Sequence, residues 1–311
     1  NENKKLSISI EKLNKDTKIT YGSGNRTDTY SNRNNYTSSI DLNESNTTRS
    51  SINYEYKSTE DKLIDNFKGS IYISSLGYEN EWQTRGLAGQ GGTITNENEI
   101  TTLDQETVGT NLEFINNISN RDSDQKILFG FEGSIFKGDR VAKESKATNN
   151  LNFGAPTTYR RNPESDVVKM GLYVQNEFSK GKFDLIGGLR YDQTNLNAHS
   201  SQEWYNSGSV FLANKAQSVG EPHDKNESSF SPHLSVLYRI NESTNVFGKY
   251  SRGFRAPSWE EVNSSHINII PYPEIDRNTG RPTGVTLYSA YTTTGNPNLK
   301  PETSDNFEIG L

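Results

Sequence analysis

The stretch Phe183-Asp-Leu-Ile-Gly-Gly-Leu-Arg-Tyr-Asp192 carries the pattern that decides the fold. Phe183, Leu185 and Leu189 occupy alternate positions, and charged residues such as Asp184 occupy positions between them. Because successive side chains of a β-strand point to opposite faces, this period of two predicts a strand with one apolar face and one polar face.

The same alternation recurs along the chain, and no segment shows the apolar spacing of an amphipathic helix. We therefore expect an all-β protein built from antiparallel strands. The other segments with this alternation are residues 6–10, 52–56, 67–73, 108–114, 127–135 and 230–238.

The composition narrows the class of protein. Only 30% of the 311 residues are apolar, yet the chain has 13 Phe and 16 Tyr, more aromatics than disordered chains usually carry. The absence of Cys excludes disulfides, thiolate metal sites and a cysteine nucleophile. A net charge of −6 argues against nucleic acid as a partner. A fold with a large solvent-exposed polar surface and a narrow apolar band, such as a transmembrane β-barrel, fits this composition.

Connection lengths support that interpretation. Short polar turns are expected at residues 14–17, 120–124, 179–182 and 241–244, and long polar segments span residues 138–166, 196–228 and 255–302. Outer-membrane barrels combine short periplasmic turns with long extracellular loops. We predict an incomplete antiparallel barrel, about 13 strands of a larger one. A soluble β-sandwich or propeller is the alternative that alternation alone leaves open.

Two motifs identify a family resemblance. Tyr250-Ser-Arg-Gly-Phe-Arg-Ala-Pro-Ser258 and Gly295-Asn-Pro-Asn-Leu-Lys-Pro-Glu-Thr-Ser304 closely resemble two boxes of TonB-dependent outer-membrane receptor barrels. Residues 171–177 and 187–192 resemble neighbouring strands of the same barrels.

The resemblance implies that residues 1–311 are part of a receptor barrel in the outer membrane of a Gram-negative bacterium, with the plug domain and the C-terminal strands outside this sequence. It implies contact with membrane lipid and energy from the TonB–ExbB–ExbD complex, reached through the plug. No catalytic motif is present, and we expect no enzyme activity.

The resemblance also bears on the identity of the transported ligand. The run from Arg255 to Asn263 resembles the haemoglobin/transferrin/lactoferrin receptor branch, and His266 lies between the two boxes, where many haem receptors place an axial ligand. The resemblance implies uptake of haem, or of a protein carrying haem or iron such as host haemoglobin, with no permanently bound cofactor. A ferric-siderophore receptor is the alternative within the family, and a soluble β-rich adhesin the alternative outside it.

Individual residues carry two interpretations each. Arg255 could clamp a carboxylate of the ligand, such as a haem propionate, or pair with Glu260 or Glu261 and brace the loop. His266 could bind haem iron or be a solvated loop residue. Tyr272 and Tyr291 lie in the same loop and offer phenolic oxygens for iron or rings for packing.

The two box cores are expected to be mostly structural. Pro257 cannot donate to a ladder, so the first core marks where a strand ends. In the second core, Pro297 fixes the backbone, so a rigid turn should aim the chain into the strand after it. The cores consist of Phe254, Arg255, Ala256 and Pro257 in the first box, and Asn296, Pro297, Asn298 and Leu299 in the second.

Overall fold

The computed structural model describes residues 3–21, 34–58, 64–88, 93–148, 151–152, 157–206, 220–276 and 279–311, and nearly all of them lie in β-strands. Its two helices, α1 (Gln202–Asn206) and α2 (Trp259–Asn263), have five residues each. Within the described ranges, no helix has the length and apolar character needed to cross a membrane.

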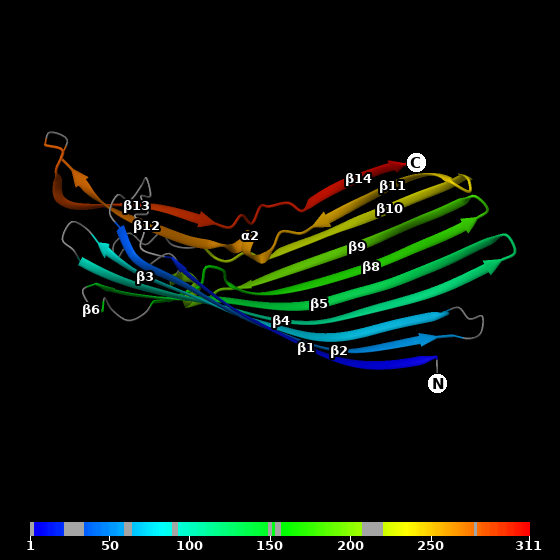
Figure 1. Ribbon diagram of the computed structural model, residues 1–311, viewed down its shortest axis with the longest axis horizontal. Coiled ribbons are helices and arrows are strands. Elements are labelled where there is room, and N and C mark those ends of the chain that lie inside the picture. The colour runs from blue at the N-terminus through cyan, green and yellow to red at the C-terminus, as the bar shows by residue number, and fades with distance from the viewer. Residues whose placement is uncertain are drawn as a thin grey trace.

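The strands form one large antiparallel sheet and one separate hairpin (Figure 1). The 12-stranded sheet has the order β1-β2-β3-β4-β5-β8-β9-β10-β11-β14, and short β6 (Leu151–Asn152) and β7 (Thr157–Tyr159) pair with β5. Its long strands are β1 (Lys4–Tyr21), β2 (Asn34–Lys57), β3 (Asn66–Ala88), β4 (Thr93–Asn120), β5 (Ser123–Thr148), β8 (Glu164–Lys180), β9 (Phe183–His199), β10 (Lys225–Asn241), β11 (Thr244–Arg255) and β14 (Glu302–Gly310).

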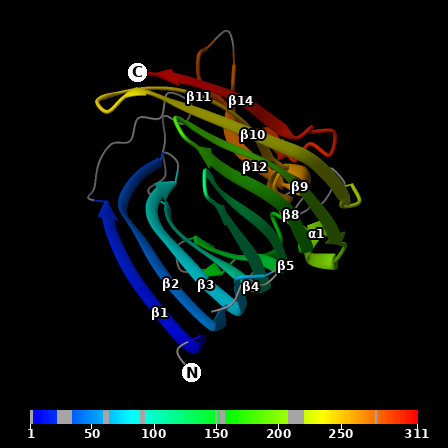
Figure 2. The same ribbon diagram turned by 90° about the vertical axis from the view of Figure 1, so that its right-hand side faces the viewer.

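The sheet curls into an open trough, with β1 along one rim and β14 along the other (Figure 2). The long strands are neighbours in chain order throughout the sheet, and all of their pairings are antiparallel. The predicted all-β, antiparallel, incomplete barrel is confirmed in this form. Within the described residues the barrel sheet has 12 strands, counting short β6 and β7, against the 13 or so expected.

Short turns gather at one end of the trough, where β4 meets β5, β8 meets β9 and β10 meets β11 (Figure 1). The turns predicted near residues 120, 180 and 242 are confirmed. Gly181 adopts φ 56°, the left-handed region that favours glycine. The turn predicted at Asn14–Thr17 is wrong, because β1 runs straight through it, paired residue by residue with Asn43–Asn46 of β2. The ladder there overrides the turn preference of Asn14 and Asp16.

The opposite end carries the long connections, and part of what looked like loop is strand. β4 and β5 have 28 and 26 residues, whereas a bilayer crossing needs about 9–11, so they continue well beyond the span of a membrane. The segment between β11 and β14 contains α2 and the antiparallel hairpin β12 (Ser265–Ile275) and β13 (Pro282–Thr294).

The ladder register places most of the apolar side chains of the long strands on one face, here called the outer face. One row of directly paired residues crosses eight neighbouring strands, and almost all of its residues are apolar. Ile71 of β3 is 61% exposed and Phe129 of β5 is 54% exposed, as expected of side chains that face lipid rather than a protein core. The row is Leu6, Tyr54, Gly69, Leu112, Phe131, Leu172, Tyr191 and Phe230.

The opposite, inner face is polar. Lys5, Glu55, Lys68 and Glu113 lie opposite one another on β1 to β4, so charges of opposite sign alternate across the strands. Lys68 Nζ lies 3.4 Å from Glu113 Oε1. Directly opposed unlike charges support this register, since a slip of one residue would place these charges on the outer face.

The two faces predict different responses to a new charge. In the receptor that carries this chain, Ile71→Arg places a cation on the lipid side of β3 and should cost about 2–4 kcal/mol of folding free energy in lipid vesicles. Its neighbour Ser70 lies on the inner face, and Ser70→Arg should cost far less. Urea unfolding in vesicles measures both, and equal losses would contradict the assignment of faces.

Candidate functional site

The first box ends β11 and begins α2. Ser258 is the N-cap of α2: its Oγ accepts a hydrogen bond from Glu261 N at 3.2 Å, and Ser258 N donates to Glu261 Oε2 at 2.8 Å. This reciprocal capping box satisfies backbone donors that a helix start leaves open. The proline two residues after Arg255 ends the strand, and the cap starts the helix at once.

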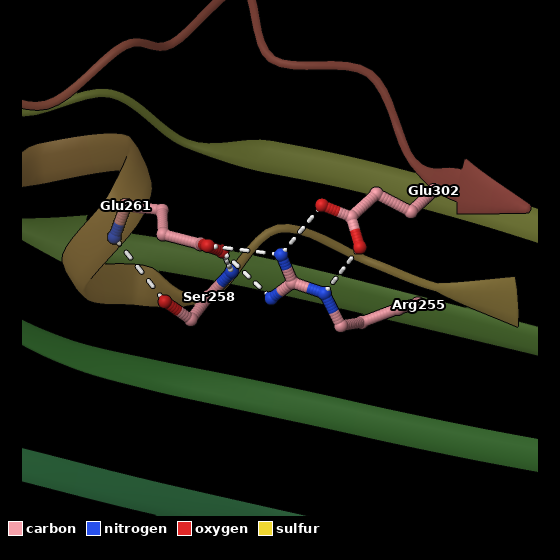
Figure 3. A network of polar contacts seen from close by, with 4 residues as sticks. All are labelled: Arg255, Ser258, Glu261 and Glu302. Atoms are coloured by element: carbon pink, nitrogen blue, oxygen red, sulfur yellow. Dashed lines mark hydrogen bonds and ion pairs between the residues drawn. The ribbon is translucent and has the colours of Figure 1, made fainter.

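Arg255 joins this helix to the strand that follows the second box (Figure 3). Its Nε and Nη2 donate to the two carboxylate oxygens of Glu302, both at 2.9 Å. Its Nη1 and Nη2 donate to those of Glu261 at 3.0 and 2.9 Å. Two bidentate pairs on one guanidinium fix its plane and link the end of β11, α2 and the start of β14.

The electrostatics of Glu261 follow from these contacts. The Arg255 guanidinium, helped by the N–H of Ser258, lowers the pKa of the Glu261 carboxyl to about 2. The Glu261 carboxylate therefore stays ionised, and its pair with Arg255 stays formed, at every pH above its ordinary range.

The apolar side of α2 packs on the inner face of the sheet. Trp259 and Val262 are 8% and 1% exposed and lie against Val167 of β8 and Leu196 of β9, with Leu103 and Phe136 at the margin. Burying such side chains stabilises by roughly 1.5–3 kcal/mol each. This small cluster anchors the helix over the wall at the long-loop end.

The second box docks directly on α2. Gly295 N donates to Ser264 O at 2.5 Å, and Asn296 N donates to Glu261 O at 2.8 Å. A Cβ at Gly295 would run into the backbone of Val262, so the close approach requires glycine.

The core of the second box forms a tight turn, with Pro297 and Asn298 as its turn residues. Asn296 Oδ1 accepts from Asn298 N at 2.9 Å, and Leu299 N donates to Asn296 O at 3.2 Å. Pro297 has no N–H to donate, but its carbonyl oxygen accepts from Lys225 Nζ at 3.1 Å. The turn is therefore tied to the start of β10 as well as to α2.

Two further connections are fastened to the same helix. Asn263, 3% exposed, accepts from His223 N and donates to His223 O, both at 2.7 Å, and so holds the β9–β10 connection. Ser265 N donates to Arg161 O at 2.7 Å and holds the segment before β8. We use the name loop hub for α2 and Arg255 together with the segments bonded to them: the second box, the β9–β10 connection and the segment before β8.

A cavity of about 750 Å³ lies between the hub and the inner face of β5, β8 and β9. Phe254 to Trp259 form one side of it. On the wall, Arg190 Nη2 donates to Glu132 Oε2 at 2.7 Å and Nε to Asp192 Oδ1 at 2.8 Å. Gly171 leaves the room that this guanidinium fills, because a Cβ there would collide with it.

Sequence reasoning missed the Arg190 cluster. The signal was present in the polar positions of the strand that contains Arg190 and Asp192, but only the strand pairing brings Glu132 of β5 across from Gly171 and Asp192.

The structure brings the two box cores together around α2. In the first core, Phe254, Ala256 and Pro257 line the cavity. In the second, Asn296 contacts α2 directly, whereas Pro297 contacts Lys225 through its carbonyl oxygen.

Arg255 and its acidic neighbours form definite pairs. Of the two interpretations of Arg255, the structure shows pairing with Glu261. Glu260 pairs instead with Arg140, at 3.4 Å.

The tentative ligand residues lie on the hairpin beyond the hub. His266 and Tyr272 belong to β12 and Tyr291 to β13, and their side chains lie outside the described residues. In the part of the chain that the structure describes, no group of three or more His, Asp or Glu is arranged to hold a metal ion.

The Glu261 carboxyl predicts how the hub responds to pH. A lowered pKa means that its stabilising contribution is full above about pH 4.5, the ordinary value, and is lost as the pH falls towards about 2. A spin label on Thr294→Cys, in a chain without native Cys, should stay immobile down to about pH 4.5 and loosen below it. In the Glu261→Gln variant the label should already be mobile at pH 7, whereas in Glu260→Gln its mobility should follow that of the parent. An increase in label mobility well above pH 4.5 would contradict the role given to the Arg255–Glu261 pair.

The contact at Gly295 predicts a matched pair of variants. Gly295→Ala should separate the second box from α2 and mobilise the same label. Gly248→Ala on β11 should have no effect, because nothing lies within 4 Å of a Cβ there. Unchanged mobility in Gly295→Ala would show that the close approach is dispensable.

Comparisons with known proteins agree with this architecture. Residues 2–311 match the family described as TonB dependent receptor-like, beta-barrel. The chain is 25% identical over 142 residues to hemoglobin-haptoglobin utilization protein B of Neisseria meningitidis serogroup A, covering 45% of this chain and 14% of that protein. It is 38% identical over 90 residues to the iron-regulated outer membrane virulence protein of Vibrio cholerae serotype O1, covering 29% and 11%.

Among solved structures, the unliganded ferric citrate transporter FecA aligns with 86% of this chain and 47% of its own, at 13% identity and a TM-score of 0.37. The chain thus spans only a small part of its curated relatives. The family consists of transporters rather than enzymes, which confirms the expectation of no enzyme activity. The chain belongs to the TonB-dependent receptor β-barrel family, and its sheet is part of a barrel of the Gram-negative outer membrane.

Proposed function

We propose that this chain belongs to a receptor that captures haem, or a protein carrying haem or iron, at the cell surface for TonB-energised import. The observation that carries the proposal is the loop hub, which fixes both ends of one hairpin at the outer end of the barrel wall. His266 is the second residue of that hairpin, directly after the hub.

The register of the hairpin supports this set of residues as a group. His266 lies opposite Thr293, Tyr272 opposite Leu287, and Tyr291 opposite Asn268. His266, Tyr272 and Tyr291 therefore occupy the same set of alternate ladder positions. Imidazole and phenolate are both ligands that haem iron accepts.

Arg255 has a different part in the proposal. Four of its N–H donors already serve Glu261 and Glu302, so a ligand carboxylate would reach it only by exchange with one of them. We assign Arg255 chiefly to holding the hub closed, with contact to a haem propionate as a second, competing role.

The rest of the uptake pathway follows the family. Energy would come from the TonB–ExbB–ExbD complex through a plug domain, and the transported ligand would be bound only in transit. The matched part of the Neisseria relative, whose name refers to haemoglobin–haptoglobin use, supports a haem source.

A ferric siderophore is the alternative ligand. The cavity of about 750 Å³ beneath the hub, lined by aromatic and charged side chains, has the volume of a small-molecule site. The Vibrio relative, described as iron-regulated, fits haem and siderophore receptors equally.

A haem titration of the complete receptor in outer-membrane vesicles tests the proposal. We expect a saturable Soret shift that His266→Ala weakens at least about ten-fold, because an axial ligand is lost. His199→Ala is the matched control, since that histidine pairs with Asp166 outside the two boxes. A shift unaffected by His266→Ala would move ligation elsewhere, and no shift in the parent would favour the siderophore.

A further inference from the structure

The hairpin β12–β13 is attached to the rest of the described structure at its base. The attachments are Ser265 N to Arg161 O, Gly295 N to Ser264 O and Asn296 N to Glu261 O. From there two strands of 11 and 13 residues run outward as a separate two-stranded sheet (Figure 1). Two-stranded sheets are marginally stable alone, so a third strand would stabilise this one.

The two edges of this sheet differ in their backbone chemistry. Pro271 lies opposite Tyr288, and Pro273 lies opposite Thr286. In an antiparallel ladder, pairs that exchange hydrogen bonds alternate with pairs whose N–H and C=O groups point away from the partner. Proline has no N–H and fits the second kind, so both prolines lie on the outward edge of β12.

Pro271 and Pro273, at neighbouring outward positions, block the edge of β12 against strand addition, a common protection of exposed edges. β13 has no such block, because its one proline, Pro282, is its first residue. By the same register, the N–H and C=O groups of Tyr288 and Ala290 point outward along β13, as do those of Thr286 and Thr292. Within the described residues, β13 pairs only with β12.

We propose that the open edge of β13 is the docking site for an extended segment of a protein ligand, which adds to the hairpin as a third strand. The chemistry selects the class of partner: a row of alternating backbone donors and acceptors is matched by another polypeptide backbone and not by haem or a small chelate. The hub holds the base while the edge engages the partner. This inference rests on the proposed function only in taking a haem-carrying protein as the ligand.

Two proline substitutions at directly opposed positions test the site. Ala290→Pro removes an outward donor from the β13 edge, and Ile269→Pro, its cross-strand partner, removes one from the edge that is already blocked. Both leave the bonds between β12 and β13 intact. With the complete receptor in outer-membrane vesicles, haemoglobin should bind Ala290→Pro about ten-fold more weakly than the parent, and Ile269→Pro within about two-fold. Free haemin should bind all three alike.

Hydrogen exchange provides an independent measurement on the parent receptor. Haemoglobin should protect the amides of Tyr288 and Ala290, and those of Thr286 and Thr292, more than the amides of Ile267 and Ile269 on the other edge.

The outcomes separate the two proposals. The proposal that the β13 edge is the docking site is overturned if Ala290→Pro binds haemoglobin as tightly as the parent does. It is also overturned if both proline variants lose haemoglobin affinity equally. Haemin binding without haemoglobin binding also overturns it and leaves the proposed function standing. An effect of Ala290→Pro on receptor self-association alone assigns the edge to a second copy and overturns the inference. Failure of haemin to bind, with haemoglobin bound in an edge-dependent way, overturns haem uptake and keeps the edge.

Discussion

The structure depends on one constraint, the register of the strands. Side chains alternate along each strand, so a shift of one residue between neighbours would move an entire apolar set from the outer face to the inner face. Two features oppose such a shift: short turns fix the offsets of β4–β5, β8–β9 and β10–β11, and opposed charges such as Lys68 and Glu113 support the observed register. Lipid contact outside and a polar interior follow from this single condition.

The loop hub depends on that register in turn. Trp259 and Val262 find Val167 and Leu196 on one patch of the inner face because β8 and β9 are paired in this offset. Arg255 reaches Glu302 because β11 and β14 are neighbours and these two residues lie opposite each other. Residues 47 positions apart in sequence therefore form one clamp. The two boxes are a single structural unit, separated in sequence by the hairpin they support.

Much of the fold could be predicted from the sequence because alternation and turn composition are local signals. Three predicted turns agree with the structure, but the turn that Asn14 and Asp16 predict does not form, because ladder pairing with β2 outweighs turn preference. The Arg255–Glu261 pair was foreseeable from a spacing of six residues, whereas Glu302 and the Arg190–Glu132 contact depend on pairing between distant strands. The sequence predicts a long loop where the structure has the hairpin β12–β13, since prolines and polar residues obscure the alternation of its strands.

The attachment of the hairpin at the hub has an evolutionary consequence. The contacts that hold it use mainly backbone atoms, with Gly295, Asn296 and the Arg255 clamp as the few residues of fixed identity. The strands beyond Ser265 and before Gly295 can therefore accept substitutions without loosening their own anchorage. Successive substitutions could then alter what the hairpin presents, one residue at a time, while the barrel that carries it keeps its register.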